Sequence, residues 1–446
     1  MSTASKPNSA NGQAGNSPTS RVALLGFGTV GSSVARILCE RRNTHLRLTH
    51  ILNRNVARKK VDWLPAEVVW TEKIDDVLSS GADIVVEVMG GLDPTEDWVR
   101  RALTSRKSVV TANKQLIAHC GPALIALAQQ MQQQIEFGAS VAGGVPVISG
   151  LHQGLAGDEL YRICGILNGT CNYILSQIEA NGVPFATALR EAQKLGFAEA
   201  DPTDDIEGLD ARAKLTILAR IGLHCDVAAS SIVARSISAI DPVDFENASL
   251  LGCTIRQISR AELKNDRLFA AIGPALVQLN SPLARVEGGQ NLVMATGVYG
   301  GETVFGGHGA GGHPTAVAVV SDILAIVRNK ERQQDGRVED KAANADSRVA
   351  AMTLQKSPVV TSDFVTKHYL RFVVKDRPGI IASLASILAE HKVNILSVLQ
   401  KPGSPKSHLP LLITLEECPN SLVEQALNQI NALDFMVQPC LHMPIL

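Results

Sequence analysis

The stretch that decides the fold is RVALLGFGTVGSSVARIL, residues 21–38. It reads as an apolar strand, a GxGxxG turn and a helix with apolar residues on one face, which is the context that a dinucleotide-binding turn requires. Gly26 allows the tight turn, Gly28 lets the backbone approach a pyrophosphate, and Gly31 permits close helix-to-strand packing. A purely structural glycine turn is the alternative. The predicted cofactor-binding turn consists of Gly26, Phe27, Gly28, Thr29, Val30 and Gly31.

Strand and helix patterns continue to alternate up to residue 149. Residues 82–89 (ADIVVEVM) are almost continuously apolar, which is typical of a strand buried on both faces of a parallel sheet. This alternation predicts an α/β domain of the Rossmann type, with a doubly wound parallel sheet, over residues 21–149. Further strands are expected at 46–52 and 108–111, and helices at 98–105 and 115–134.

The remaining chain divides into a second and a third unit. Residues 150–312 are predicted to form an α+β domain, and the helix at 313–330 to pack back on the first domain. Residues 331–366 are charged and predict a linker. Residues 367–446 have the order β-α-β-β-α-β, which predicts a ferredoxin-like domain. Residues 1–20 are small and polar, and predict a disordered tail.

Composition limits the possible partners. The chain has 446 residues, 42 Lys and Arg against 43 Asp and Glu, and only 4% aromatic residues. This balance argues against nucleic acid, whose binding proteins usually carry a basic excess. No apolar run is long enough to span a membrane, and residues 1–20 lack the apolar centre of a signal peptide. The eight cysteines form no CxxC pair, so we expect reduced thiols and a cytoplasmic protein.

The segment after the second strand bears on the choice of cofactor. An NAD site usually has Asp or Glu there to hold the ribose hydroxyls, whereas this chain has Asn53 and Arg54. Lys59 and Lys60 follow closely. Arg54 could therefore contact a 2′-phosphate, which favours NADP(H), although NAD(H) stays possible and Arg54 could simply be solvated.

The most informative segment is GFAEADPTDDIEGLDARAK, residues 196–214, which holds six carboxylates. An EF-hand is excluded because Ile206 replaces its glycine and Arg212 its last ligand. A solvated acidic loop is the simplest alternative. Asp210 and Lys214, however, are four apart on a helix whose apolar residues continue the same face. Such a pair is either a buried ion pair or a proton-transfer group.

Three other segments offer candidate ligands. Lys114 ends the TANK segment at the ligand-binding edge of the sheet, where it could reach a cofactor or substrate or be a surface lysine. Thr170 follows a strand at a helix start, where it could bind a substrate carboxylate or lie in an ordinary N-cap. His308 and His313 have no Glu or Cys at ligand spacing, so they predict no metal site.

These motifs together resemble the homoserine dehydrogenase family. The similar segments are GFGTVG, VMGG (88–91), VVTANK (109–114), GILNGTCNYIL (165–175), the acidic block at 196–214 and GAGGHPTA (309–316). The third unit resembles an ACT domain, with KDRPG (375–379) as its ligand-site loop. The resemblance indicates the monofunctional, ACT-bearing form, and it implies that residues 150–312 are the catalytic and dimerisation domain.

The resemblance implies reduction of L-aspartate 4-semialdehyde to L-homoserine with NAD(P)H, on the route to threonine, methionine and isoleucine. Lys214 is then the proton donor, and Asp210 orients it. Glu199 and Asp205 hold the substrate ammonium, and Thr170 lines the substrate pocket. Lys114 contacts both cofactor and substrate, whereas Gly196 and Gly312 lie near the nicotinamide.

Two further expectations come from the family. Members usually bind sodium through a Glu and backbone carbonyl groups, but here Gly138 replaces the Glu, leaving the carbonyls of Val141, Gly143 and Val145, with Glu136 nearby. A homo-oligomer, dimer or tetramer, is expected because ACT domains commonly pair through sheet edges. Thr414-Leu415 replaces the usual Thr-His pair of the ACT domain, which weakens the case for threonine feedback. The alternatives are an ACT-regulated dehydrogenase of another amino acid and a non-enzymatic amino-acid sensor.

Overall fold

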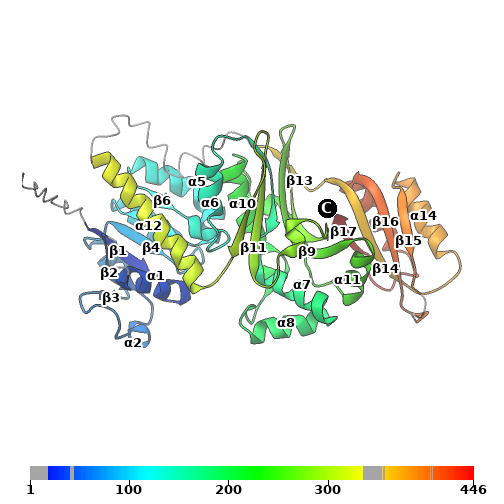
Figure 1. Cartoon of the computed structure of the whole chain (residues 1–446), viewed down its shortest axis with the longest axis horizontal. Coiled ribbons are helices and arrows are strands. Elements are labelled where there is room, and N and C mark those ends of the chain that lie inside the picture. Colours follow the sequence, from blue (N-terminus) through cyan, green and yellow to red (C-terminus); the bar gives the residue numbers. More distant parts are fainter. Residues whose placement is uncertain (1–18, 41–44, 335–353, 355–356, 402, 404) are drawn as a thin grey trace, which may run out of the picture.

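The computed structural model describes residues 19–40, 45–334, 354, 357–401, 403 and 405–446. Residues 1–18 of the predicted tail (1–20) and much of the predicted linker at 331–366 therefore lie outside the described residues, whereas Ser20 already belongs to the first strand. The described chain forms an elongated molecule in which the N-terminal and C-terminal units lie at opposite ends of a central sheet (Figure 1).

The N-terminal domain is a parallel six-stranded sheet in the order β3-β2-β1-β4-β5-β6. The prediction of a Rossmann-type α/β fold is confirmed, because this order places the start of the winding between β1 and β4. The strands are β1 (Ser20–Leu25), β2 (Leu46–Leu52), β3 (Val69–Thr71), β4 (Ile84–Glu87), β5 (Ser108–Thr111) and β6 (Ile135–Glu136). The helices between them are α1 (Thr29–Glu40), α2 (Val56–Lys59), α3 (Ile74–Leu78), α4 (Thr95–Thr104) and α5 (Lys114–Gln130).

Both faces of this sheet are covered, which explains its continuous apolar strands. Ala23 and Val85 point into a core with α4 and α5, whereas their neighbours Val22 and Ile84 point into a second core. That second core contains α1 and α12 (Gly312–Gln334). Helix α12 follows the central domain in sequence but lies on α1 of the N-terminal domain (Figure 1).

The central domain is built on the antiparallel strands β12-β11-β7-β9-β10. The strands are β7 (Leu160–Ile166), β9 (Cys253–Lys264), β10 (Arg267–Gln278), β11 (Gln290–Gly297) and β12 (Gly301–His308), with the short β8 (Val233–Ala234) beside β10. The helices are α6 (Val147–Ser149), α7 (Gly169–Asn181), α8 (Phe185–Lys194), α9 (Thr203–Ile206), α10 (Leu209–Gly222) and α11 (Pro242–Leu250). Helix α10 packs on β7, β9 and β10, so it forms part of the domain's core.

The C-terminal domain has the predicted β-α-β-β-α-β order, with the sheet order β17-β14-β16-β15. Its elements are β14 (Val365–Val374), α14 (Ile380–Glu390), β15 (Ile395–Leu399), β16 (Leu409–Pro419), α15 (Asn420–Ile430) and β17 (Leu441–Ile445). Two features differ from the predicted linker: β14 begins before residue 367, and β13 (Val359–Thr361) pairs with β10. A β-branched run can add to an open sheet position even where its flanks are charged.

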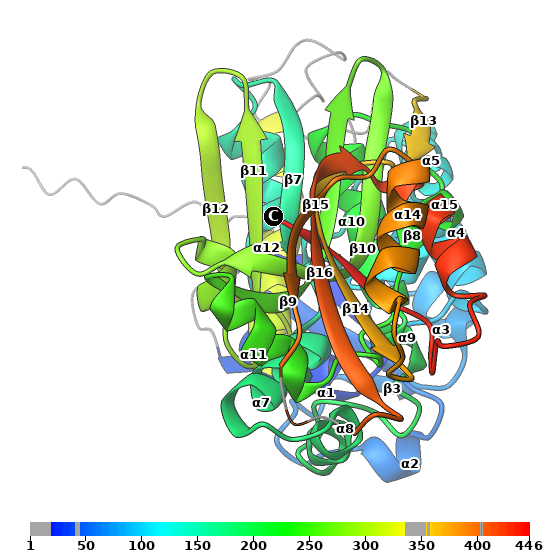
Figure 2. The same ribbon diagram turned by 90° about the vertical axis from the view of Figure 1, so that its right-hand side faces the viewer.

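The sheets of the central and C-terminal domains are continuous. Leu276 of β10 pairs with Ile445 of β17, and the Leu446 amide donates to the Leu276 carbonyl at 2.8 Å. The C-terminal sheet therefore lies directly against the central domain (Figure 2). In the described part of the chain, no helix combines the length and apolar character needed to cross a membrane.

Candidate active site

The GFGTVG turn lies at the carboxyl edge of the parallel sheet, between β1 and α1. Gly26 has φ +99°, a conformation that favours glycine, and a Cβ on Gly31 would come within 2.1 Å of the Gly26 carbonyl oxygen. A Cβ on Gly28 would meet no atom within 4 Å, so this backbone faces open space. The Phe27 amide donates to Asn53 Oδ1 at 3.2 Å, which ties the turn to the end of β2. Thr29 and Val30 open α1.

Two predicted cofactor residues, Arg54 and Gly312, lie outside the glycine turn. Arg54 is exposed directly after β2, at the same edge of the sheet, and Lys59 and Lys60 are exposed at the end of α2. Gly312 lies against the start of α1, where an added Cβ would come within 3.0 Å of the Thr29 carbonyl oxygen. Arg54 therefore lies at the carboxyl edge of the sheet, and Gly312 lies close to the first residue of α1.

Three charged side chains meet where the N-terminal and central domains join. Asp210, in the first turn of α10, accepts from Lys214 Nζ at 2.6 Å through Oδ2. Lys114, the first residue of α5, lies 2.9 Å from Asp210 Oδ1. Asp210 is buried, while the lysine side chains keep 37% (Lys114) and 13% (Lys214) exposure. The arrangement is therefore a carboxylate clamped between two ammonium groups that reach toward solvent.

Amide side chains hold this centre in place. Asn168 caps α7 by accepting from the Cys171 amide, and its Nδ2 donates to Asp210 at 2.9 Å and Asp205 at 2.6 Å. The Leu167 carbonyl accepts from Lys214 Nζ at 2.8 Å and from Asn291 Nδ2 at 2.9 Å. Lys214 thus has two fixed acceptors, which orient its ammonium group.

Burial and the neighbouring charges have opposite effects on the pKa of Asp210. Burial by itself would raise its pKa, but the ammonium groups of Lys214 and Lys114 hold the pKa well below the usual range. Asp210 raises the pKa of Lys114 in return, against the effect of burial. The pKa of Asp205 is raised, mainly by burial. Asp210 therefore stays ionised at any neutral pH, which keeps both lysines anchored.

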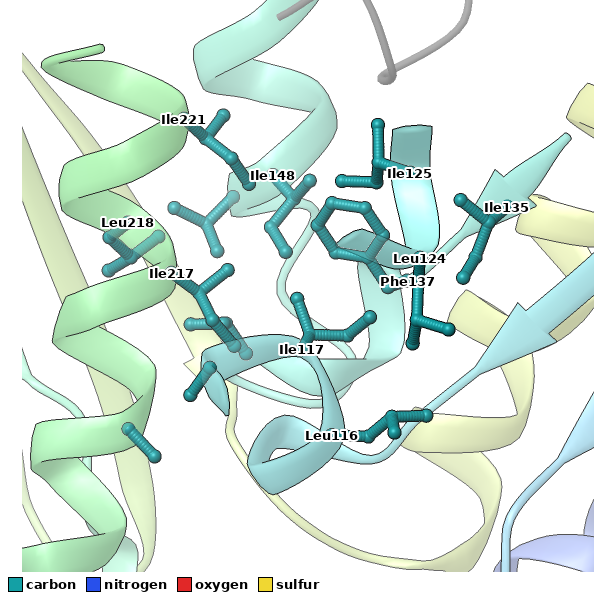
Figure 3. Close-up of a cluster of buried hydrophobic side chains, with 14 of the residues drawn as sticks. Leu116, Ile117, Leu124, Ile125, Ile135, Phe137, Ile148, Ile217, Leu218 and Ile221 are labelled. Atoms are coloured by element: carbon teal, nitrogen blue, oxygen red, sulfur yellow. The ribbon is translucent and has the colours of Figure 1, made fainter. Parts of the chain in front are cut away.

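An apolar core fixes the distance between Lys114 and the α10 pair. Helices α5 and α10 share a cluster of side chains (Figure 3) that includes Leu116, Ile117, Phe137, Ile217 and Ile221. The buried Arg220 guanidinium also donates to carbonyl groups of α5, at 2.7 Å for Ala118. Because the core and these bonds join two helices from different domains, the triad depends on their docking.

The six carboxylates of the acidic block do not act as one group. Asp205 and Asp210 point toward Asn168, whereas Glu199, Asp201, Asp204 and Glu207 are exposed. Thr170 donates to the Phe197 carbonyl at 2.8 Å, which links α7 to this block. Gly196 adopts φ +78° at the start of the block, after α8.

The segment expected to bind sodium contains backbone carbonyl groups, and the carboxylate nearest to it in the sequence, Glu136, is buried at the end of β6. The Val145 carbonyl accepts from the Val147 amide at 2.8 Å, and Gly138 donates its amide to Asp322 at 2.7 Å. Among the described residues, no group of three or more His, Cys, Asp or Glu side chains could hold a metal ion. The carbonyl oxygens of Val141, Gly143 and Val145 are ligands of a type that hard cations prefer.

Comparison with known proteins agrees with this architecture. Family models match residues 146–324 (Homoserine dehydrogenase), 26–138 (Homoserine dehydrogenase, NAD binding domain) and 368–435 (ACT domain). A homoserine dehydrogenase of Mycobacterium tuberculosis is 40% identical over 394 residues, covering 85% of this chain and 86% of the relative. The chain belongs to the homoserine dehydrogenase family. It is therefore an NAD(P)-dependent oxidoreductase acting on a CH–OH group, with a C-terminal ACT domain.

Solved structures of homoserine dehydrogenases share the fold. One from Thiobacillus denitrificans aligns with a TM-score of 0.87 at 32% identity, covering 96% of this chain and 98% of that chain. A hyperthermophilic archaeal homoserine dehydrogenase in complex with NADPH aligns with a TM-score of 0.59 at 26% identity, covering 70% and 98%.

Three buried polar residues, near the triad or at the carboxyl edge of the parallel sheet, were not predicted from the sequence as part of this region. Glu87 is fully buried at the end of β4 and accepts from the amides of Met89 (2.7 Å) and Gly90 (3.1 Å) and from Thr111 Oγ1 (2.5 Å). Glu87 is the one charged residue inside the strand part of the apolar run ADIVVEVM, and this pattern could have indicated a buried carboxylate at the end of β4. Asn168 could have been predicted as a helix N-cap from the sequence. No local sequence pattern predicts the contact that Asn291 makes with the Leu167 carbonyl.

Proposed function

We propose that this protein is an NADP-dependent homoserine dehydrogenase that reversibly reduces L-aspartate 4-semialdehyde to L-homoserine. The observation that carries the proposal is the Lys114–Asp210–Lys214 triad, placed beside a dinucleotide-binding edge. A carboxylate held ionised between two ammonium groups can keep one lysine positioned as a proton donor.

Lys214 is the proposed proton donor to the alkoxide that develops from the aldehyde. Its ammonium is held by Asp210 and by the Leu167 carbonyl, so it retains one N–H bond for the substrate. In the reverse direction the neutral amine accepts the proton of the homoserine hydroxyl. A bound nicotinamide cofactor supplies or accepts the hydride.

The acidic block provides the proposed site for the substrate ammonium. Asp205 is bonded to Asn168 and lies beside the catalytic pair, and we assign it and Glu199 to the ammonium group. Thr170 is assigned to the wall of the substrate pocket, and Lys114 to contact with both substrate and cofactor. This arrangement suits a small zwitterionic amino acid.

The proposed cofactor site is formed by the turn Gly26, Phe27, Gly28, Thr29, Val30 and Gly31, with Arg54, Lys114, Gly196 and Gly312. Arg54 supports NADP(H) over NAD(H) because Asn53 and Arg54, and not Asp or Glu, directly follow β2. Lys59 and Lys60 are close in sequence. The NADPH complex of the archaeal relative is consistent with this preference.

The proposal includes regulation of the enzyme by an amino acid through the ACT domain, a homo-oligomer, and a place in threonine, methionine and isoleucine biosynthesis. Sodium, held at most by the carbonyls of Val141, Gly143 and Val145, is proposed to bind weakly and to take part in no chemical step.

The test is an assay of homoserine-dependent reduction of NADP and NAD at alkaline pH, with a panel of other hydroxy amino acids. We expect turnover with homoserine and a preference for NADP. Faster turnover of another amino acid would favour a related dehydrogenase, and no turnover with intact cofactor binding would favour a sensor.

Arg54→Ala tests the cofactor preference separately. It should raise the KM for NADP by about 10-fold or more while changing that for NAD little, because only NADP has the 2′-phosphate. Equal losses for the two cofactors would remove the assignment of Arg54.

A further inference from the structure

A cleft lies between the central domain and the ACT domain. Its volume is about 500 Å³, within the range of small-molecule sites. Residues 235–241, between β8 and α11, form one wall, and residues 438–442, leading into β17, form the other. Because each domain supplies one wall, an occupant would contact both.

The wall from the central domain has groups of opposite charge. Arg235 is 34% exposed and pairs with Glu424 of α15 through Nη2, which leaves Nε and Nη1 without a hydrogen-bond partner among the described residues. Asp241 is 53% exposed and lies before α11. The hydroxyls of Ser236 and Ser238 are bonded to each other at 2.9 Å between them. A guanidinium and a carboxylate in one cleft match a ligand with both an anionic and a cationic group.

The other wall provides an imidazole whose hydrogen-bonding role can be deduced. His368 Nε2 lies 3.0 Å from the Cys418 carbonyl, which only accepts, so this nitrogen carries the hydrogen. In the neutral ring, His368 Nδ1 then accepts from His442 Nε2 at 3.0 Å. Burial, Arg235 and His368 all lower the pKa of His442, which favours its neutral form. His442 Nδ1 is therefore an acceptor in a residue that lines the cleft.

Asp241 also connects the cleft to the domain junction. Arg371 of the ACT strand β14 lies 3.4 Å from Asp241 and donates to the Ala239 carbonyl at 2.8 Å. The same guanidinium donates to the buried Asp244 in the first turn of α11 at 2.7 Å. Helix α11 packs on α7, whose N-cap Asn168 holds the catalytic carboxylates.

We propose that this cleft is a binding site for a small α-amino acid, with its carboxylate on Arg235 and the Ser236–Ser238 hydroxyls, and its ammonium on Asp241 and His442. The site is separate from the KDRPG loop and from the catalytic triad. A phosphorylated ligand is disfavoured, because Asp241 would repel it and Arg235 already shares its charge with Glu424.

Isothermal titration calorimetry of the full chain tests the site with L-serine, L-threonine and L-valine. At least one of them should bind with a Kd of about 1 mM or tighter. Ethanolamine lacks the carboxylate of serine and glycerate lacks its ammonium, so each should bind at least about 10-fold more weakly than L-serine. Hydrogen exchange should slow in both 235–241 and 438–442 on binding.

Matched variants locate the binding. Arg235→Gln and Asp241→Asn should each weaken it by about 10-fold or more. Glu424→Gln breaks the same ion pair as Arg235→Gln but keeps the guanidinium, so it should bind as well as the unchanged protein. Thermal melting of the three variants verifies that each is folded.

Two further variants separate this cleft from other sites. Asp205→Asn in the proposed substrate pocket and Asp376→Asn in the KDRPG loop should leave the affinity unchanged. The inference is overturned if no probe binds at about 10 mM. It is equally overturned if Arg235→Gln binds normally, or if either of these distant variants abolishes binding while Arg235→Gln does not.

Discussion

Asp210 in the proposed catalytic centre and Asp244 at the domain junction are both buried aspartates in the first turn of a helix, yet their partners differ. Asp210 is held by two lysines whose side chains remain partly exposed. Asp244 is held by one arginine, Arg371, which is only 3% exposed, and by the Tyr369 hydroxyl at 2.7 Å. The first cluster keeps donors available to a ligand, whereas the second has its carboxylate enclosed by protein groups.

The number of cations decides the protonation preference of these carboxyl groups. Two ammonium groups overcome burial at Asp210 and lower its pKa, whereas burial outweighs the single Arg371 at Asp244 and raises the pKa there. Glu87 extends the series, because burial raises its pKa and no cation contributes. The comparison therefore distinguishes the ionised Asp210, which can support proton transfer, from Asp244 and Glu87, whose buried carboxyl groups stabilise the fold.

The largest effect should follow the loss of Lys214. Lys214→Ala should reduce kcat by about 10²–10⁴-fold, the usual contribution of a positioned general acid, while NADPH binding is retained. Steady-state kinetics and the fluorescence of bound NADPH measure the two properties. Lys194→Ala, an exposed lysine at the end of α8, is the control and should be fully active. Full activity of Lys214→Ala would contradict its catalytic assignment.

The enclosed cluster should matter for stability instead. Arg371→Met removes the only cation that ion-pairs with Asp244 in the described structure, and should cost about 3–5 kcal/mol because a buried carboxylate loses its partner. Urea unfolding followed by circular dichroism measures this loss. Arg377→Met breaks an exposed ion pair of the same domain and should have no measurable effect. Equal losses of unfolding free energy in Arg371→Met and Arg377→Met would contradict the proposed difference between the enclosed and the exposed ion pair.

A smaller effect should separate substrate binding from proton transfer within the catalytic centre. Asp205→Asn should raise the KM for homoserine by about 10–100-fold with a lesser change in kcat, because a charged hydrogen bond to the ammonium is lost. Asp204→Asn alters an exposed neighbour and serves as the control. A loss confined to kcat would instead assign Asp205 to the chemical step.

The smallest expected effect is the pH dependence of stability at Glu87. Its pKa is raised in the folded state, so the folded protein holds the proton more tightly, and stability should fall as pH rises above the unfolded pKa of about 4.3. Glu87→Gln cannot titrate but can keep the bonds to Met89, Gly90 and Thr111. The unfolding free energy of the unchanged protein, relative to Glu87→Gln, should therefore decrease as the pH is raised from 5 to 8. A constant or increasing difference would show that Glu87 is not destabilised by its charge.

Local sequence patterns predicted much of the fold and part of the candidate site. GFGTVG predicted the first turn because its glycines have strict steric roles, and ADIVVEVM predicted a buried strand from its apolar run. The order of the C-terminal elements predicted its ferredoxin-like sheet. Asp210 and Lys214 were paired in advance, since residues four apart share a helix face.

What the sequence by itself determined is therefore what short-range geometry controls: the turn, the strands and helices, and the pair on α10. The approach of Lys114 to Asp210 depends on the packing of α5 against α10, and the bridge made by Asn168 depends on where α7 begins relative to α10. Asp244 and Arg371 are 127 positions apart, and meet because the ACT domain docks on the central domain. Only the tertiary structure decided these contacts, because residues far apart in the sequence meet only when their elements pack together.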